Sequence, residues 1–174
     1  MIVSLTGFMG SGKSSVGEIL AARLGCEWVD LDSYIEKKIG LSIPEIFEFQ
    51  GETGFRAIEA EAIRDVLVMH ILTHTDMVLS LGGGSLQIGA LRDYILENSL
   101  CFYLQAPLET LLDRIGADRS SRPVLAGCQA PEELLAEREK NYRLAHRTVP
   151  TGGLTAEQVA GQIYGIIKGG KVDD

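Results

Sequence analysis

Residues 7–14 read GFMGSGKS and form a complete G-x-x-x-x-G-K-S motif. The motif follows an apolar run at residues 2–5 and leads into a helical pattern at residues 13–24. Glycines let the backbone N–H groups of such a loop curl around an anion, and the positive end of the following helix points at the same place. Lys13 is expected to reach the β- and γ-phosphates of a nucleotide, and Ser14 to hold Mg²⁺. The strand-loop-helix setting favours this phosphate loop over a glycine-rich turn that binds nothing.

The chain has 174 residues, of which 45% are hydrophobic, and this favours one compact α/β domain over residues 1–174. No apolar run reaches the roughly 18 residues of a membrane span, and the N-terminus lacks the pattern of a signal peptide. The cysteines Cys26, Cys101 and Cys128 are widely spaced and include no C-x-x-C pair, which favours reduced thiols. We therefore expect a cytoplasmic protein without a membrane partner.

The formal net charge of −8 argues against a nucleic-acid partner, because non-specific binding to phosphate backbones needs an accessible excess of Lys and Arg. The positive charge is unevenly distributed, however, and six arginines lie between residues 114 and 147. This pattern predicts a local anion site within an acidic protein. Arg143 and Arg147 are expected instead to lie on solvated faces.

Short β-type runs alternate with helix-period stretches along most of the chain. The expected strands are residues 2–5, 27–31, 77–81, 100–104 and a short one near 148–149. The expected helices are residues 13–24, 33–39, 52–70, 88–97, 107–115, 131–145 and 156–167, with a further helix from the capping box SIPE at 42–45 to about residue 49. Such alternation predicts a mostly parallel sheet covered by helices on both faces.

Residues 116–130 have little periodicity and many turn-forming residues. Periodic α/β structure resumes on both sides of them, which favours a mobile loop over a linker between domains. Arg122 lies within this loop.

Two carboxylates follow the second expected strand, in the segment WVDLD at residues 28–32. The two-residue period of a strand places Asp30 and Asp32 on the same side, near the edge of the sheet where ligands bind in open α/β folds. One carboxylate can orient Mg²⁺ through water, and the other can hold or deprotonate an acceptor hydroxyl. The alternative is that both only start a turn and a helix, since Ser33 and Glu36 match a capping box.

The expected helix at 131–145 carries an arginine on its apolar face. Arg138 falls four residues after Leu134 and four before Tyr142, both of which are apolar positions. A guanidinium directed inward needs a partner, because an unpaired buried charge is unfavourable. A bound carboxylate or phosphate is one candidate, and an internal pair with Asp or Glu is the other.

Residues 82–84 read GGG and end the third expected strand, where a common type of ATPase carries a Walker-B carboxylate. Glycine at this place lets a ligand approach the backbone closely. A tight turn alone needs at most two glycines, so the run favours a binding role.

Together these motifs resemble shikimate kinase, a family in the nucleoside-monophosphate-kinase-like branch of phosphate-loop proteins. The resemblance spans nearly the whole chain, and its most specific part is GETGFRAIE at residues 51–59. Its other parts are the phosphate loop, DLD at 30–32 followed by Ile35 and Glu36, SIPEIF at 42–47, LGGG at 81–84 and RPVL at 122–125.

The resemblance implies a three-layer P-loop kinase fold, with a five-stranded parallel sheet of order 2-3-1-4-5, a mobile lid at about 116–130 and a monomeric state. It also implies that ATP phosphorylates the 3-hydroxyl of shikimate, giving ADP and 3-phosphoshikimate on the route to chorismate and the aromatic amino acids. Shikimate is thus the expected small-molecule partner, and ATP and Mg²⁺ are the expected cofactors.

Each role is carried over from the family to a matching position. Shikimate is expected to contact Asp32, Arg56, Gly82, Gly83 and Arg138, with both arginines on its carboxylate. The nucleotide is expected to contact Gly10, Ser11, Gly12, Lys13, Ser14, Ser15, Arg114 and Arg122. Lys13, Asp32 and Arg122 are the expected catalytic residues. Ser14 is the expected Mg²⁺ ligand, and Asp30 is expected to act on the metal through water.

Three other readings stay open from the sequence. Gluconate kinase shares the fold and a similar phosphate loop, but it does not predict Phe55-Arg56 with Glu59. A nucleoside monophosphate kinase would phosphorylate AMP or CMP instead. A nucleotide-dependent switch would bind nucleotide without turnover.

Overall fold

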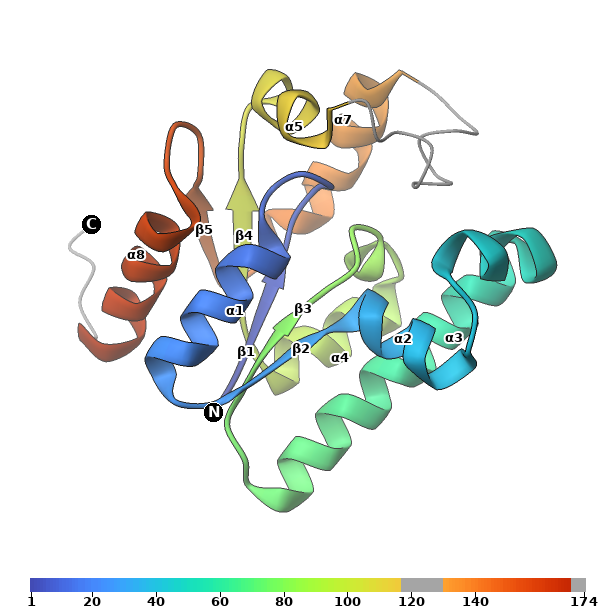
Figure 1. The fold of residues 1–174 in the computed structure, drawn as a ribbon, viewed down its shortest axis with the longest axis horizontal. Coiled ribbons are helices and arrows are strands. Elements are labelled where there is room, and N and C mark those ends of the chain that lie inside the picture. The colour runs from blue at the N-terminus through green and yellow to red at the C-terminus, as the bar shows by residue number, and fades with distance from the viewer. Residues whose placement is uncertain (117–129, 170–174) are drawn as a thin grey trace.

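The computed structural model describes residues 1–116 and 130–169. Its strands form one parallel sheet in the order β2-β3-β1-β4-β5 (Figure 1), which confirms the expected topology. The strands are β1 (Ile2–Thr6), β2 (Glu27–Asp30), β3 (Met77–Ser80), β4 (Leu100–Gln105) and β5 (Arg147–Pro150). The loop expected at 116–130 lies outside the described residues apart from its two end positions.

Helices cover both faces of the sheet, so the three-layer α/β architecture is confirmed (Figure 1). They are α1 (Lys13–Leu24), α2 (Leu31–Ile39), α3 (Ile43–Thr73), α4 (Gly89–Asn98), α5 (Leu108–Ile115), α7 (Pro131–Tyr142) and α8 (Ala156–Gly169), with a 3₁₀ turn η1 (Ser85–Gln87). Helices α1 and α8 pack on one face, and α2, α3, α4, α5 and α7 contribute to the apolar cluster on the other. No helix within the described residues is both long and apolar enough to cross a membrane.

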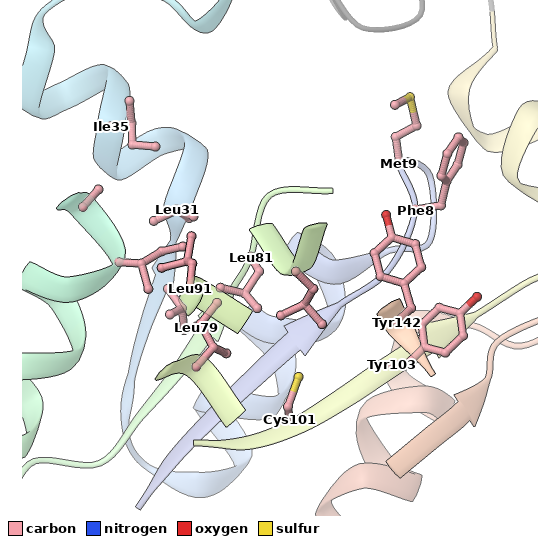
Figure 2. Close-up of a cluster of buried hydrophobic side chains, with 14 of the residues drawn as sticks. Phe8, Met9, Leu31, Ile35, Leu79, Leu81, Leu91, Cys101, Tyr103 and Tyr142 are labelled. Carbon is pink, nitrogen blue, oxygen red and sulfur yellow. The ribbon is translucent and has the colours of Figure 1, made fainter. Parts of the chain in front are cut away.

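The strand period of two separates the two apolar clusters. Phe102 on β4 packs with α1 and α8, whereas its neighbours Cys101 and Tyr103 point into the opposite cluster. Figure 2 shows the second cluster, where Tyr103 lies beside Tyr142 at the end of α7. Both faces of the sheet are therefore buried, as is typical of parallel sheets.

The start of α2 differs from the expectation. The strand β2 ends at Asp30, and the helix begins at Leu31 because the Asp30 side chain caps it, accepting from the Ser33 N–H at 3.1 Å. The alternative that both carboxylates lie at the start of a helix is confirmed in this respect, but the cap is Asp30 and not Ser33, and Asp32 lies in the first helical turn. The two-residue period of a strand therefore does not determine the position of Asp32, because Asp32 is helical. Both carboxylates still lie at the carboxyl edge of the sheet.

The two helices expected at 42–49 and 52–70 form one continuous element, α3, with a kink at Gly51. The capping box is confirmed, because the Ser42 N–H donates to Glu45 Oε2 at 2.7 Å and the Ser42 side chain accepts from the Glu45 N–H. Gly51 has φ 67° and ψ −177°, a conformation that glycine tolerates best. The kink turns the start of α3 relative to its long second part (Figure 1).

Helix α7 ends at Tyr142, three residues before the expected end at 145. The Leu144 N–H donates to the Asn141 carbonyl at 3.1 Å, and the Ala145 N–H donates to the Tyr142 carbonyl at 3.0 Å. These tighter i to i−3 bonds close the last turn and lead the chain into β5.

Candidate functional site

The phosphate loop joins β1 to α1 at the carboxyl edge of the sheet. Gly7 and Gly10 have φ angles of 149° and 78°, and the chain passes close to other backbone at both. A Cβ on Gly7 would lie 2.7 Å from the Leu104 carbonyl oxygen, and one on Gly10 would lie 2.6 Å from that of Leu111. Glycine is therefore required at both positions by conformation and by space.

Lys13 begins α1 and folds back over the loop that precedes it. Its Nζ donates to the carbonyl oxygens of Gly7 and Phe8, at 3.0 and 3.1 Å. The ammonium charge is thus held at the mouth of the loop, in the position from which it can meet a phosphate.

Ser14 and Asp30 come together although they lie on different elements. The Ser14 hydroxyl donates to Asp30 Oδ2 at 2.6 Å, while Asp30 Oδ1 caps α2. This cap fixes the carboxylate beside the phosphate loop. A hydroxyl and a carboxylate side by side offer the oxygen ligands that Mg²⁺ prefers.

Asp32 lies next to this pair, on the first turn of α2. Asp32 is exposed and lines the cavity, where the charges of Asp30, Glu36 and Glu59 act on it. Desolvation, followed by the charge of Asp30, raises its pKa to about 6, and Lys13 opposes this shift. A carboxyl group with a pKa near the working pH is suited to accept a proton from a hydroxyl.

Arg56 is held by a buried carboxylate. Glu59, one turn later on α3, is fully buried, and its Oε2 lies 2.7 Å from Arg56 Nη1. Glu59 Oε1 also accepts from the Ser85 hydroxyl at 2.7 Å. On its other side Arg56 Nη2 lies 3.4 Å from the exposed Glu52. The guanidinium is therefore fixed in orientation on α3.

The glycines after β3 make room for these side chains. A Cβ on Gly82 would lie 2.6 Å from Glu59 Oε1, and a Cβ on Gly84 would collide with the Arg56 guanidinium. Side chains of α3 thus lie against Gly82 and Gly84, which gives a further reason for glycine there. All three glycines line the cavity, and their contact with a ligand stays a prediction. At Gly83 a Cβ would make only ordinary contact, 3.5 Å from Arg138 Nη1.

Arg138 points inward from α7, as its place on the apolar face predicts. It is 6% exposed, and its Nη1 donates to the Gly83 carbonyl at 3.3 Å. Within residues 1–116 and 130–169 it forms no ion pair with an Asp or Glu. The alternative of an internal acidic partner finds no support there, and the charge remains available to an anion in the cavity.

Of the two remaining arginines expected at the nucleotide, the structure describes only Arg114. Arg114, at the end of α5, donates through Nη2 to the carbonyls of Thr151 and Leu154, at 3.0 and 3.5 Å. It thereby ties the segment after β5 to the cavity wall. Arg122 lies outside the described residues, and its role stays a prediction.

One cavity of about 880 Å³ joins all of these groups. The expected site residues that line it are Gly10, Ser11, Gly12, Lys13, Ser14, Ser15, Asp30, Asp32, Arg56, Gly82, Gly83, Arg114 and Arg138. At one end lie Arg114, Thr151 and Leu154, and at the other Arg56 and Phe47 of α3. The phosphate loop contributes to the wall between them, so the cavity has room for two ligands that meet at the loop.

Sequence reasoning assigned no role to two further residues of this cavity, Glu59 and Ser80. The Ser80 hydroxyl donates to the Lys13 carbonyl at 2.9 Å and accepts from Trp28 Nε1 at 3.1 Å, so it anchors the start of α1. For Glu59, the sequence does offer a signal, which is its i, i+3 spacing from Arg56 on a helix. No local pattern marks Ser80, because its partners come from distant parts of the chain.

Comparison with known proteins agrees with this arrangement. A family model described as shikimate kinase matches residues 9–168. A shikimate kinase of Salinibacter ruber is 40% identical over 178 residues, covering 96% of this chain and 84% of that protein. The solved shikimate kinase from Acinetobacter baumannii, in complex with shikimate, is 34% identical with a TM-score of 0.87, covering 99% of this chain and 95% of that one. That from Aquifex aeolicus is 31% identical with a TM-score of 0.80, covering 98% of each chain.

The family match includes the loop from Met9 onward and the elements that form both ends of the cavity. The resemblance drawn from the motifs is thereby confirmed. This chain belongs to the shikimate kinase family.

Proposed function

We propose that the protein transfers the γ-phosphoryl group of ATP to the 3-hydroxyl of shikimate, giving 3-phosphoshikimate and ADP. The observation that carries this proposal is the single cavity in which a phosphate loop faces a carboxylate and two guanidinium groups. The Acinetobacter baumannii relative was solved in complex with shikimate, which supports this choice of acceptor.

The nucleotide is proposed to occupy the end of the cavity beside α1, α5 and α8. The backbone of Gly10, Ser11 and Gly12 faces the phosphates there, with the side chains of Lys13, Ser14 and Ser15 at the start of the helix. Arg114 is proposed to stand against the nucleoside side, where it holds the segment at 151–154.

Mg²⁺ is proposed to be held by the Ser14 hydroxyl, with Asp30 acting through water. The 2.6 Å contact between the two side chains supports this, because a cation between phosphate and protein needs such oxygen ligands. When bound, the metal supplies positive charge to the phosphates. Asp30 orients Ser14, and the cap that it makes on α2 keeps it in place.

The acceptor end holds two guanidinium groups, those of Arg56 and Arg138, beside the carboxylates of Glu59 and Asp32. Glu59 pairs with Arg56, whereas Arg138 has no Asp or Glu partner within residues 1–116 and 130–169. A ligand carboxylate can supply that partner, because planar guanidinium groups match a carboxylate well. We propose that both arginines take the carboxylate of shikimate and that Gly82 and Gly83 form the adjoining floor.

In the proposed reaction the 3-hydroxyl oxygen of shikimate forms a bond to the γ-phosphorus, and the bond from that phosphorus to the bridging oxygen of ADP breaks. The hydroxyl proton passes to the Asp32 carboxylate, whose pKa of about 6 suits this role. Lys13 and, from the segment outside the described residues, Arg122 are proposed to neutralise charge on the group in transfer.

The test is ADP release by the purified protein with MgATP and shikimate, gluconate, AMP, CMP or no acceptor. Strong stimulation by shikimate alone is the expected result. Stimulation by gluconate or a nucleotide would show that this compound, and not shikimate, is the acceptor. Nucleotide binding without any turnover would overturn the proposal. We also propose that the protein acts as a monomer, which sedimentation at assay concentration tests.

A further inference from the structure

Tyr142 does not line the cavity, but its hydroxyl reaches Gly83, which does. It is the last residue of α7, and its side chain is fully buried. Its ring packs on that of Tyr103, with the centroids 5.2 Å apart and the planes tilted by 32° (Figure 2). Packing alone would be served equally well by phenylalanine, so the hydroxyl group needs a separate reason.

The Tyr142 hydroxyl donates a hydrogen bond to the carbonyl oxygen of Gly83. The same oxygen accepts from Arg138 Nη1 at 3.3 Å. The two donors lie four residues apart on α7, on the same face of the helix. The Gly83 carbonyl therefore accepts hydrogen bonds from two side chains of α7.

The hydroxyl remains a donor over the working range of pH. Burial raises the pKa of Tyr142 to about 12, and the charge of Arg138 opposes this shift. The neighbouring Tyr103 hydroxyl has another partner, because it donates to Glu139 Oε1 at 3.3 Å. The two rings thus share one apolar cluster, but of their two hydroxyls the one that bonds to Gly83 is that of Tyr142.

The bond matters because Gly83 has no side chain to fix its peptide plane. A planar trans peptide turns as a unit, so holding the Gly83 carbonyl also sets the direction of the next N–H group. A carbonyl has two lone pairs, and Tyr142 occupies one of them. Without that bond, the Gly83 peptide loses one of its two side-chain restraints, and the Arg138 guanidinium loses a fixed hydrogen-bond partner.

We propose that Tyr142 is a positioning residue for the acceptor site, which holds the Gly83 carbonyl so that Arg138 stays turned toward the carboxylate of the acceptor. The proposal rests on the proposed function for the identity of that acceptor. Tyr142 touches no reacting atom in this account, and its effect passes through Gly83 and Arg138.

The test replaces Tyr142 by phenylalanine, which keeps the ring and removes the hydroxyl. We expect Tyr142→Phe to raise the KM for shikimate about three- to tenfold, the factor that one net hydrogen bond provides. The kcat and the KM for MgATP should stay within about twofold of wild type. Tyr103→Phe is the matched control, since it removes the same group from the adjacent ring, and it should leave all three constants unchanged.

A second measurement does not depend on the acceptor. Amide hydrogen exchange over residues 82–84 of the ligand-free protein should be faster in Tyr142→Phe than in wild type or Tyr103→Phe. Equal exchange and an equal KM for shikimate in wild type and Tyr142→Phe would overturn the inference, as would the same changes in both variants. Absence of shikimate-dependent turnover in wild type would instead overturn the proposed function, and the exchange comparison would still decide whether Tyr142 holds the turn.

Discussion

The carboxylate of Glu59 and the guanidinium of Arg56 lie 2.7 Å apart on one face of α3, and Glu59 is fully buried. This pair fixes one of the two positive charges at the acceptor end of the cavity. Its burial makes it sensitive to the loss of either charge, because a buried charge without its partner is strongly unfavourable.

Glu59→Gln should therefore weaken both the fold and acceptor binding. We expect the free energy of unfolding to fall by about 2 kcal/mol, the value of a charge-assisted hydrogen bond, and the KM for shikimate to rise by about tenfold. Glu52→Gln is the control, because Glu52 lies 3.4 Å from the same guanidinium but is 65% exposed. Equal effects of the two substitutions, measured by denaturant unfolding and steady-state kinetics, would contradict the role of burial.

Asp32→Asn should lower kcat by about 10²-fold or more, because the carboxylate is the proposed proton acceptor. In the wild type, kcat/KM should fall as the pH drops below about 6, where Asp32 gains its proton. Initial rates over a pH series measure both effects. Asp93→Asn, at an exposed carboxylate on α4, should leave the pH profile unchanged.

Asp32→Asn should also stabilise the fold at higher pH. The pKa of Asp32 is raised from 3.8 to about 6, so the folded protein holds this proton more tightly than the unfolded chain does. Ionisation of Asp32 therefore opposes folding, to an extent that grows between these two values and is complete above about pH 6. The Tm of Asp32→Asn should exceed that of wild type more at about pH 8 than at about pH 4. A constant difference across this range would show that folding does not raise the pKa of Asp32.

Asp30→Asn separates the charge of Asp30 from its structural role. Asparagine caps a helix as well as aspartate does, so α2 should keep its start and the Tm should change little. The Mg²⁺ concentration for half-maximal activity should rise by about tenfold, as is typical when a group that orients a metal ligand is lost. A Mg²⁺ titration at saturating substrates measures this, with Asp113→Asn on the exposed side of α5 as the control. An unchanged Mg²⁺ requirement would remove Asp30 from the metal site.

Gly51→Ala should destabilise the protein by about 1–3 kcal/mol, since its φ of 67° and ψ of −177° strain any residue with a Cβ. Among the described residues, no heavy atom outside the adjoining chain lies within 4 Å of the added Cβ, so the effect is expected to come from the backbone. Gly165→Ala is the matched control, inside helix α8 and also without a neighbour within 4 Å. It should stabilise by about 0.5–1 kcal/mol, so denaturant unfolding should give the two variants opposite signs.

The amino-acid sequence determined the phosphate loop, the alternation of strands and helices, and the inward direction of Arg138. Each of these features depends on the spacing of residues within one short segment, and that spacing can be read directly from the sequence. The glycines of the motif at 7–14 all have a positive φ, which is a local property, and Arg138 occupies an apolar position of its own helix. Element ends were less predictable, because the cap at Asp30 and the short bonds after Tyr142 depend on details of a few residues.

Only the tertiary structure decided which groups share a site. The Gly82 and Gly84 positions are filled by side chains from α3, and Ser80 joins Trp28 to the start of α1. The Gly83 carbonyl meets Tyr142 and Arg138, more than fifty residues away along the chain. No local pattern encodes such contacts, because the parallel sheet and its crossover helices bring these segments together only after folding.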